Sequence, residues 1–161
     1  MSHGSLGLNS PAQFHDFSEV TELVGRKQIG FWDYLNVRGH FELAAAFAKL
    51  YWPDFIEVDG SIFLAEQYSE ANYRAWRERG VAREQVESAI NHCHVYDLFL
   101  NADRDQVDPV VYETIGKTLQ KTWACALADA FPNRTFTFSY AIEPDAYGPT
   151  LTFWELPPSN S

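Results

Sequence analysis

The chain contains few basic residues. Among its 161 residues, 12 are Lys or Arg and 22 are Asp or Glu, so the formal net charge at pH 7 is −10. A phosphate backbone is bound by clustered Lys and Arg side chains. The four arginines between residues 74 and 83 come closest to such a cluster, but glutamates are interleaved with them. We therefore expect neither a nucleic-acid partner nor an anionic membrane partner.

Cysteines are equally scarce: the chain has 2, Cys93 and Cys125. This number excludes a small secreted scaffold held together by disulfides, because such scaffolds are rich in cysteine. Both residues lie in apolar stretches of helical character, and no signal peptide precedes them. We expect two buried free thiols in a reducing compartment, and hence a cytoplasmic protein.

Long apolar runs and motifs of known chemistry are also missing. No stretch approaches the ~20 apolar residues that a membrane-spanning helix needs. The sequence has no glycine-rich phosphate loop, no Gly-x-Ser-x-Gly elbow, no His-Glu-x-x-His and no cysteine pair at zinc spacing. We expect no membrane span and no cofactor, and a non-catalytic protein is favoured over an enzyme.

Apolar and aromatic residues are abundant. They make up 46% and 16% of the chain, and at this length one packed core is expected. Residues 11–156 should form a single globular domain. Residues 1–10 are expected to be a flexible arm, part of which could be an expression tag, and 157–161 a flexible tail.

The order of helical and strand patterns predicts an α+β fold. Helical periodicity and capping signals predict helices over 16–24, 31–51 with a division at Gly39, 69–79, 82–100 and 109–131. Two hairpins are predicted near 55–66 and 135–156, the first with Asp59-Gly60 in its turn. Its register should place Ile56 opposite Phe63 and Val58 opposite Ser61. We expect one antiparallel sheet of about four strands packed against about four helices.

Polar side chains are densest between residues 87 and 97. Glu87, Asn91 and His94 recur at i, i+4 and i+7, and Asp97 comes three residues later. On one helix these side chains would share a face, where a carboxylate could orient His94 for general acid–base work. A stripe of this kind is more often a solvated or hydrogen-bonded polar face, so these four residues are candidates and no more.

His92 and His94 are two residues apart. On a helix this spacing turns the side chains roughly 160° away from one another, whereas in a strand both would lie on one face. Because the surrounding apolar residues indicate a helix, we reject a metal-binding pair. For the same reason neither histidine is placed to take a proton from Cys93.

A short acidic segment comes next. Asn101, Asp103 and Asp105 have the one-three-five spacing of an EF-hand loop. However, Gln106 stands where the loop needs glycine, and Tyr112 stands where it needs a bidentate glutamate. We expect no metal, and these three residues remain the candidates should one bind.

Two functions fit these observations. The first is a small acidic protein-interaction domain, regulatory or inhibitor-like and without catalysis, whose partner could be a basic protein. The second is a small-molecule-binding or enzymatic domain with an aromatic-lined pocket and the His94–Asp97 polar pair. The aromatic residues expected in that pocket are Phe136, Phe138, Tyr140, Phe153, Trp154, Trp32, Tyr51 and Trp52. The missing catalytic motifs favour the first.

Overall fold

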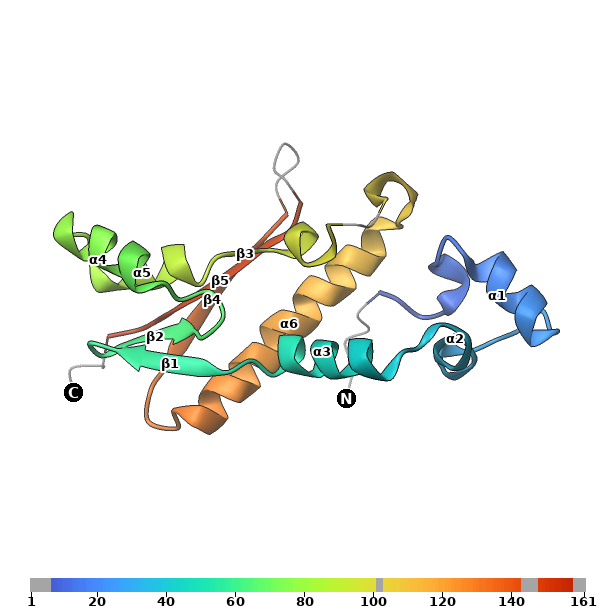
Figure 1. Cartoon of the computed structure of the whole chain (residues 1–161), viewed down its shortest axis with the longest axis horizontal. Coiled ribbons are helices and arrows are strands. Elements are labelled where there is room, and N and C mark those ends of the chain that lie inside the picture. Colours follow the sequence, from blue (N-terminus) through green and yellow to red (C-terminus); the bar gives the residue numbers. More distant parts are fainter. Residues whose placement is uncertain (1–6, 101–102, 143–147, 158–161) are drawn as a thin grey trace.

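A computed structural model describes residues 7–100, 103–142 and 148–157, and within these ranges it confirms the α+β class (Figure 1). Six α-helices and five strands are present in the described part, together with three short 3-10 segments. Their order is η1 (Pro11–Gln13), α1 (Phe17–Val24), α2 (Phe31–Arg38), α3 (Phe41–Tyr51), β1 (Phe55–Val58), β2 (Ser61–Leu64), α4 (Glu70–Glu78), α5 (Arg83–Ile90), β3 (Cys93–His94), η2 (Val95–Phe99), η3 (Arg104–Gln106), α6 (Pro109–Ala130), β4 (Phe136–Ala141) and β5 (Thr150–Glu155). In the same residues no helix has the length and apolar character needed to cross a membrane.

The expected single sheet is in fact two antiparallel sheets. The β1–β2 hairpin stands alone and has the predicted register, with Ile56 opposite Phe63 and Val58 opposite Ser61. The second sheet has the order β3–β5–β4. The prediction of one sheet was wrong because side chains of α5, rather than backbone ladders, connect β2 with β5.

Two side chains of α5 make this connection. The Glu87 carboxylate accepts the N–H of Ile62 at 3.1 Å on β2 and the N–H of Glu155 at 2.8 Å on β5. One turn later, the Asn91 amide accepts the N–H of Leu64 at 3.0 Å and donates to the carbonyls of Ile62 and Phe153 at 2.9 and 3.3 Å. We call these two residues the α5 bridge. It gives the facing strand edges the hydrogen bonds that a neighbouring strand would otherwise supply.

The α5 bridge is completely buried, since both Glu87 and Asn91 are 0% exposed. Burial raises the pKa of the Glu87 carboxyl above its usual range, while the Ile62 N–H and the Arg83 guanidinium act in the opposite direction. Arg83 Nε lies 3.2 Å from the carboxylate and its guanidinium also pairs with Glu155. A buried charge of this kind persists when donors surround it.

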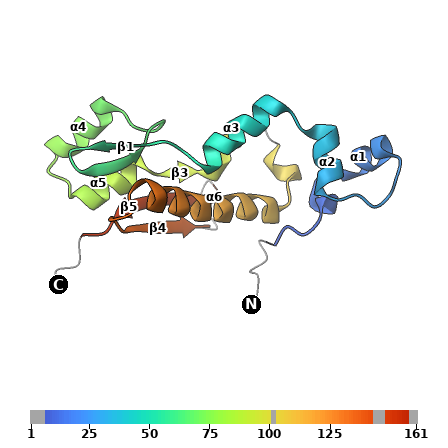
Figure 2. The same ribbon diagram turned by 90° about the horizontal axis from the view of Figure 1, so that it is seen from below.

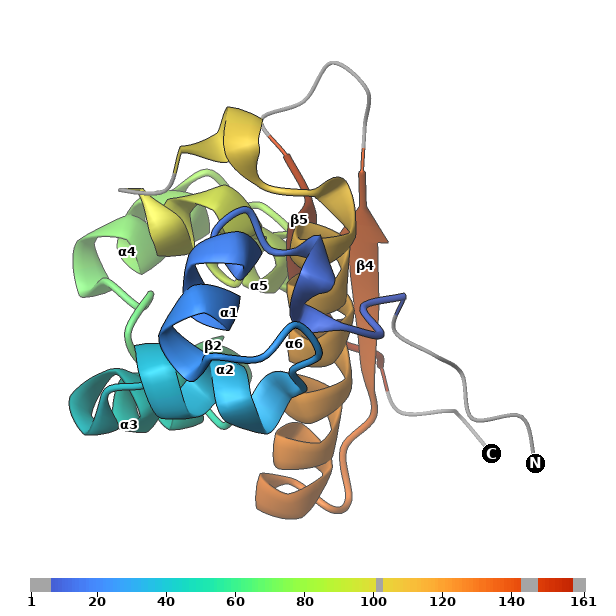
Figure 3. The ribbon, with the colours of Figure 1, turned by 90° about the vertical axis from the view of Figure 1, so that its right-hand side faces the viewer.

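Apolar residues lie on both faces of the strands. Figures 2 and 3 show α6 running beside the longer sheet. On the α6 face, β2 and β5 contribute to one core cluster, and on the α4–α5 face Phe63 of β2 contributes to another. The first cluster consists of Ile62, Leu64, Cys93, Leu119, Trp123, Leu127, Leu151 and Phe153, and the second of Phe63, Tyr73, Val86 and Ile90. Successive strand residues therefore face different helices, as strand geometry requires.

Close packing of α6 on β4 depends on Gly116. A Cβ at this position would overlap the Tyr140 ring, which therefore rests directly on the helix backbone. Glycine costs about 1 kcal/mol in a helix interior relative to alanine. This cost is offset by the direct contact between helix and strand.

The N-terminal helices pack differently from the rest. Gly39 divides the predicted helix over 31–51 into α2 and α3, as expected, and no residue of either helix is buried. Asp16 is the N-cap residue of α1, but its side chain makes no capping hydrogen bond and instead accepts from the Tyr34 hydroxyl at 2.9 Å and from Arg38 at 3.0 Å. Figure 1 shows α1 and α2 at the end of the molecule opposite α4.

The α5 bridge makes a direct prediction about stability. Glu87→Gln would turn an amide NH₂ toward backbone N–H donors, which leaves a buried donor unpaired and should cost about 1–3 kcal/mol of unfolding free energy. The matched control is Glu84→Gln on the same helix, expected to stay within about 0.5 kcal/mol of wild type. Urea unfolding followed by tryptophan fluorescence measures both, and equal midpoints for the two variants would contradict a bonding role for Glu87.

Candidate functional site

The chain after α5 does not continue as the predicted helix over 82–100. The helix ends at Ile90, Asn91 is its C-cap residue, and Cys93–His94 form the short strand β3. β3 pairs with β5, with Cys93 opposite Leu151 and His94 opposite Thr150. A 3-10 segment, Val95–Phe99, comes after it. The prediction was wrong in its second half because pairing with β5 outweighs local helix propensity.

Gln67 fixes the turn at this point. The Gln67 amide is oriented so that its nitrogen, and not its oxygen, faces two backbone carbonyls. The nitrogen donates to the carbonyl of Ile90 at 2.9 Å and to that of His92 at 3.1 Å. The first of these carbonyls belongs to the last helical residue, whose oxygen has no partner within the helix. Gln67 thereby stabilises the change from helical to extended backbone.

The extended backbone brings His92 and His94 together. Their Nε2 atoms lie 3.2 Å apart, and their rings meet edge to face at 75° with centroids 4.7 Å apart. The expectation that the two side chains point apart was wrong, because the helix ends at Ile90 and the two side chains, that of His92 directly before β3 and that of His94 within it, lie on the same side. Burial, and to a smaller extent the charge of His94, lower the pKa of His92 below its usual range.

Beside His92 lies an open groove of about 650 Å³. Trp76 of α4 and Trp154 of β5 provide its aromatic walls. Its remaining lining residues are Val81, Glu84, Gln85, Ser88, Ala89 and His92. We call it the tryptophan groove, and its volume falls in the range of about 300–1,000 Å³ common for small-molecule sites.

The four polar residues expected on one helix face have separate positions. Glu87 and Asn91 are buried in the α5 bridge and are engaged with backbone groups of β2 and β5. His94 is half-buried in β3, and Asp97 is exposed in the 3-10 segment η2. The general acid–base arrangement remains a prediction for His94 and Asp97, whereas Glu87 and Asn91 have a structural role.

The acidic segment offers little to a cation. Asn101 lies outside the described residues, and Asp103 and Asp105 are exposed. Asp103 accepts a hydrogen bond from the Gln106 side chain at 2.6 Å. Within the described ranges, no group of three or more His, Cys, Asp or Glu side chains is arranged to hold a metal ion.

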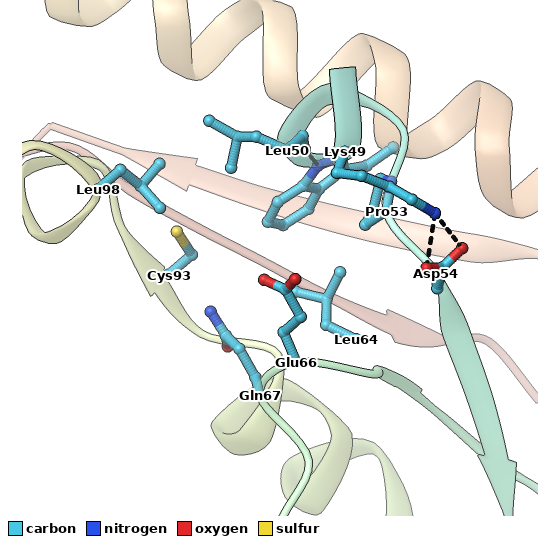
Figure 4. A pocket seen from close by; sticks show the side chains of 10 residues that line it. Lys49, Leu50, Pro53, Asp54, Leu64, Glu66, Gln67, Cys93 and Leu98 are labelled. Atoms are coloured by element: carbon cyan, nitrogen blue, oxygen red, sulfur yellow. Dashed lines mark hydrogen bonds and ion pairs between the residues drawn. The ribbon is translucent and has the colours of Figure 1, made fainter. Parts of the chain in front are cut away.

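A smaller cavity of about 80 Å³ lies between α3, β2, β3 and α6. Figure 4 shows Cys93 and Leu98 on one side, with Glu66, Gln67 and the Lys49–Asp54 ion pair around the opening. Its volume is well below that of common ligand pockets. We therefore place no ligand in it.

The two cysteines differ in environment. Cys93 is 4% exposed, and its burial raises the pKa of the thiol to about 11. Cys125 is a free thiol on the exposed side of α6, so the expectation that both are buried was wrong. The error arises because α6 has a mixed surface on which an apolar residue is not always turned inward.

The aromatic residues expected to line one pocket are distributed over the molecule. Phe136, Phe138 and Tyr140 pack against the core cluster on the α6 face, where Phe153 is fully buried. Trp154 lines the tryptophan groove, and Tyr51 packs beside the core. Trp32 and Trp52 are exposed, with 83% and 50% of their surface accessible.

Large apolar side chains are exposed on α2 and α3. Trp32, Leu35, Phe41 and Leu43, which we call the α2–α3 surface, are 83%, 58%, 93% and 50% exposed. Between the two helices lies a groove of about 310 Å³, lined by Tyr34, Leu35, Arg38, Gly39, His40, Leu43, Ala44 and Phe47. Exposed apolar area of this kind often marks an interaction site.

No protein-family model, curated protein or solved structure matches the chain. The geometry of the described residues is therefore the basis for any functional assignment.

The histidine pair was missed for a reason visible in the sequence. Asparagine directly after the last helical residue is a helix-termination signal, and Asn91 has that position before two histidines at strand spacing. The exposure of the α2–α3 surface cannot be recognised in the sequence, because a buried apolar helix and an exposed one have the same sequence pattern.

The cysteine environments predict different reactivities. At pH 8 Cys93 should stay protonated, because burial raises the pKa of its thiol to about 11 and the thiolate is the reactive form. Its side chain should also be inaccessible to reagents, because the residue is 4% exposed. Titration of native protein with a thiol-specific reagent should modify one cysteine per chain rapidly and the second only after unfolding. Cys125→Ser should remove the rapid phase and Cys93→Ser should leave it. Two rapid phases in wild type would contradict the burial of Cys93.

Proposed function

We propose that this protein is a protein-interaction domain without catalysis, and that its partner covers the α2–α3 surface. The supporting observation is that α3 is almost entirely apolar and yet has no buried residue. Nine of its 11 residues are apolar, all except Glu42 and Lys49, yet none is buried. A helix that is apolar on nearly all sides is normally found in a protein core or a membrane. Contact with a partner would remove this apolar surface from water.

The residue types on the α2–α3 surface support the same conclusion. Aromatic side chains such as Trp32 and Phe41 are enriched at protein interfaces and often dominate their affinity. The groove beside Leu35 and Leu43 could receive an apolar side chain from the partner. Binding would then be of the kind in which a helix or an apolar segment fills a groove between helices.

We propose further that the partner is basic and that the domain acts on it as a regulatory or inhibitor-like protein. The net charge of −10 creates a long-range field that attracts a positively charged protein. The helices that carry the α2–α3 surface have charges of both signs, including Asp33, Glu42 and Arg38. Charge should therefore govern the association rate, and apolar contact the lifetime of the complex.

The experiment places a photo-crosslinking amino acid at Phe41 in cells that produce the chain. The control carries it at Glu78, exposed on α4, which lies at the end of the molecule opposite α1 and α2. A partner should crosslink at Phe41 and not at Glu78. With that partner purified, Leu43→Asp should weaken binding at least about tenfold, or about 1.4 kcal/mol, without lowering the melting temperature, because Leu43 is half exposed.

The salt dependence of the reconstituted complex separates the two parts of this proposal. An association rate that falls with salt supports a basic partner. An association rate that does not change with salt concentration argues against electrostatic attraction but not against the apolar interface. Equal crosslinking at both positions, or unchanged binding by Leu43→Asp, would overturn the assignment of the α2–α3 surface.

A second candidate is the binding of a small molecule in the tryptophan groove. Its support is the volume of about 650 Å³ between Trp76 and Trp154, since aromatic walls with a few polar groups are typical of such sites. Native mass spectrometry of untagged protein should show an added mass that Trp154→Ala loses and Trp32→Ala keeps. Bare polypeptide in every preparation would count against this candidate.

A further inference from the structure

We propose that His92 and His94 form a chelating site for a divalent transition-metal ion of the zinc, nickel or copper type. This site is independent of the α2–α3 surface and of the proposed partner. It rests on the position of the two imidazoles, which share one face of an extended segment with their Nε2 atoms 3.2 Å apart.

This separation agrees with coordination of one ion by both rings. For metal–nitrogen distances of about 2.0–2.1 Å and a tetrahedral angle of about 109°, the two ligand nitrogens stand about 3.3–3.4 Å apart. The observed 3.2 Å thus needs almost no adjustment. The rings are inclined at 75° to one another, so they do not stack and both nitrogens can point toward a common position.

The backbone holds both ligands in place. His94 belongs to β3 and lies opposite Thr150 of β5. The carbonyl of His92 accepts a hydrogen bond from the Gln67 side chain at 3.1 Å. Between the two histidines, Cys93 is 4% exposed and anchors the segment in the core on the α6 face. Strand alternation therefore directs both imidazoles to the opposite face.

The surroundings leave coordination positions open, and the nearby Arg79 guanidinium lies over the Trp76 ring, with its Cζ 5.6 Å from the ring centroid. The tryptophan groove reaches His92 and contains Glu84 but no Lys or Arg among its described lining residues. Arg83, on the same helix, is engaged with Glu87 and Glu155. Because two protein ligands do not complete a coordination sphere, water or an external ligand in the groove would supply the remaining positions.

The ligand type predicts which ions bind. Imidazole nitrogen suits Zn²⁺, Ni²⁺ and Cu²⁺, whereas Mg²⁺ and Ca²⁺ prefer oxygen. The Irving–Williams order places Cu²⁺ above both Ni²⁺ and Zn²⁺ for such a site. Affinity should therefore be highest for Cu²⁺, lower for Zn²⁺ and undetectable for Mg²⁺.

Calorimetric titration of untagged protein with each ion tests the proposal. Cys125→Ser serves as the background, because an exposed thiol could bind the same metals. One Zn²⁺ per chain is expected. Loss of an outer-sphere partner alone costs about 10–100-fold in metal affinity, so His92→Ala and His94→Ala should each weaken binding by at least about tenfold. His40→Ala is the matched control, since His40 is exposed beside α3.

A spectroscopic measurement covers the case in which His94→Ala disturbs β3. Two-bond nitrogen–proton correlation spectra of the intact protein should show Zn²⁺ shifting Nε2 of both His92 and His94, and leaving His40 unchanged. The two Nε2 atoms share a hydrogen bond of 3.2 Å whose donor depends on the tautomers of the rings, and a bound Zn²⁺ would replace it. No zinc binding at about millimolar concentration, binding that His92→Ala leaves intact, or Mg²⁺ binding of equal strength would each overturn the chelate.

Discussion

The described structure depends on the α5 bridge. β2 and β5 present backbone N–H and carbonyl groups to one another across a gap that no strand fills, and such groups cannot remain buried without partners. Glu87 and Asn91 supply those partners from a helix. One helix thereby joins two small sheets, each of which would otherwise expose a strand edge.

The same bridge determines the course of the chain after α5. Because Asn91 is both the C-cap of α5 and a hydrogen-bond partner of both strand edges, the helix cannot continue past it without removing those hydrogen bonds. The chain turns, pairs briefly with β5 and presents His92 and His94 side by side. The histidine pair is thus a consequence of the structural network, although neither histidine belongs to that network.

The N-terminal helices differ from the rest of the protein in how little apolar surface they bury. The body of the protein buries its apolar residues on two faces of the strands, whereas no residue of α2 or α3 is fully buried and only the end of α3, at Leu50 and Tyr51, packs against the core. Burying a Leu or Phe side chain fully contributes about 1.5–3 kcal/mol, so four exposed large side chains leave a considerable free energy available for association. The interaction domain that we propose would therefore combine a packed body with a separate surface for association.

The sequence by itself determined the fold class, the register of the first hairpin and the division at Gly39. These features arise from turn chemistry and local periodicity, which act between residues close in the chain. Only the tertiary structure decided which thiol is buried, why α6 carries a glycine against Tyr140, and that Glu87 and Asn91 serve the backbone rather than solvent. Each of these depends on partners tens of residues away, such as Phe153 for Asn91. The pattern of a segment specifies its own conformation, but the burial of its side chains is set by the elements that pack against it.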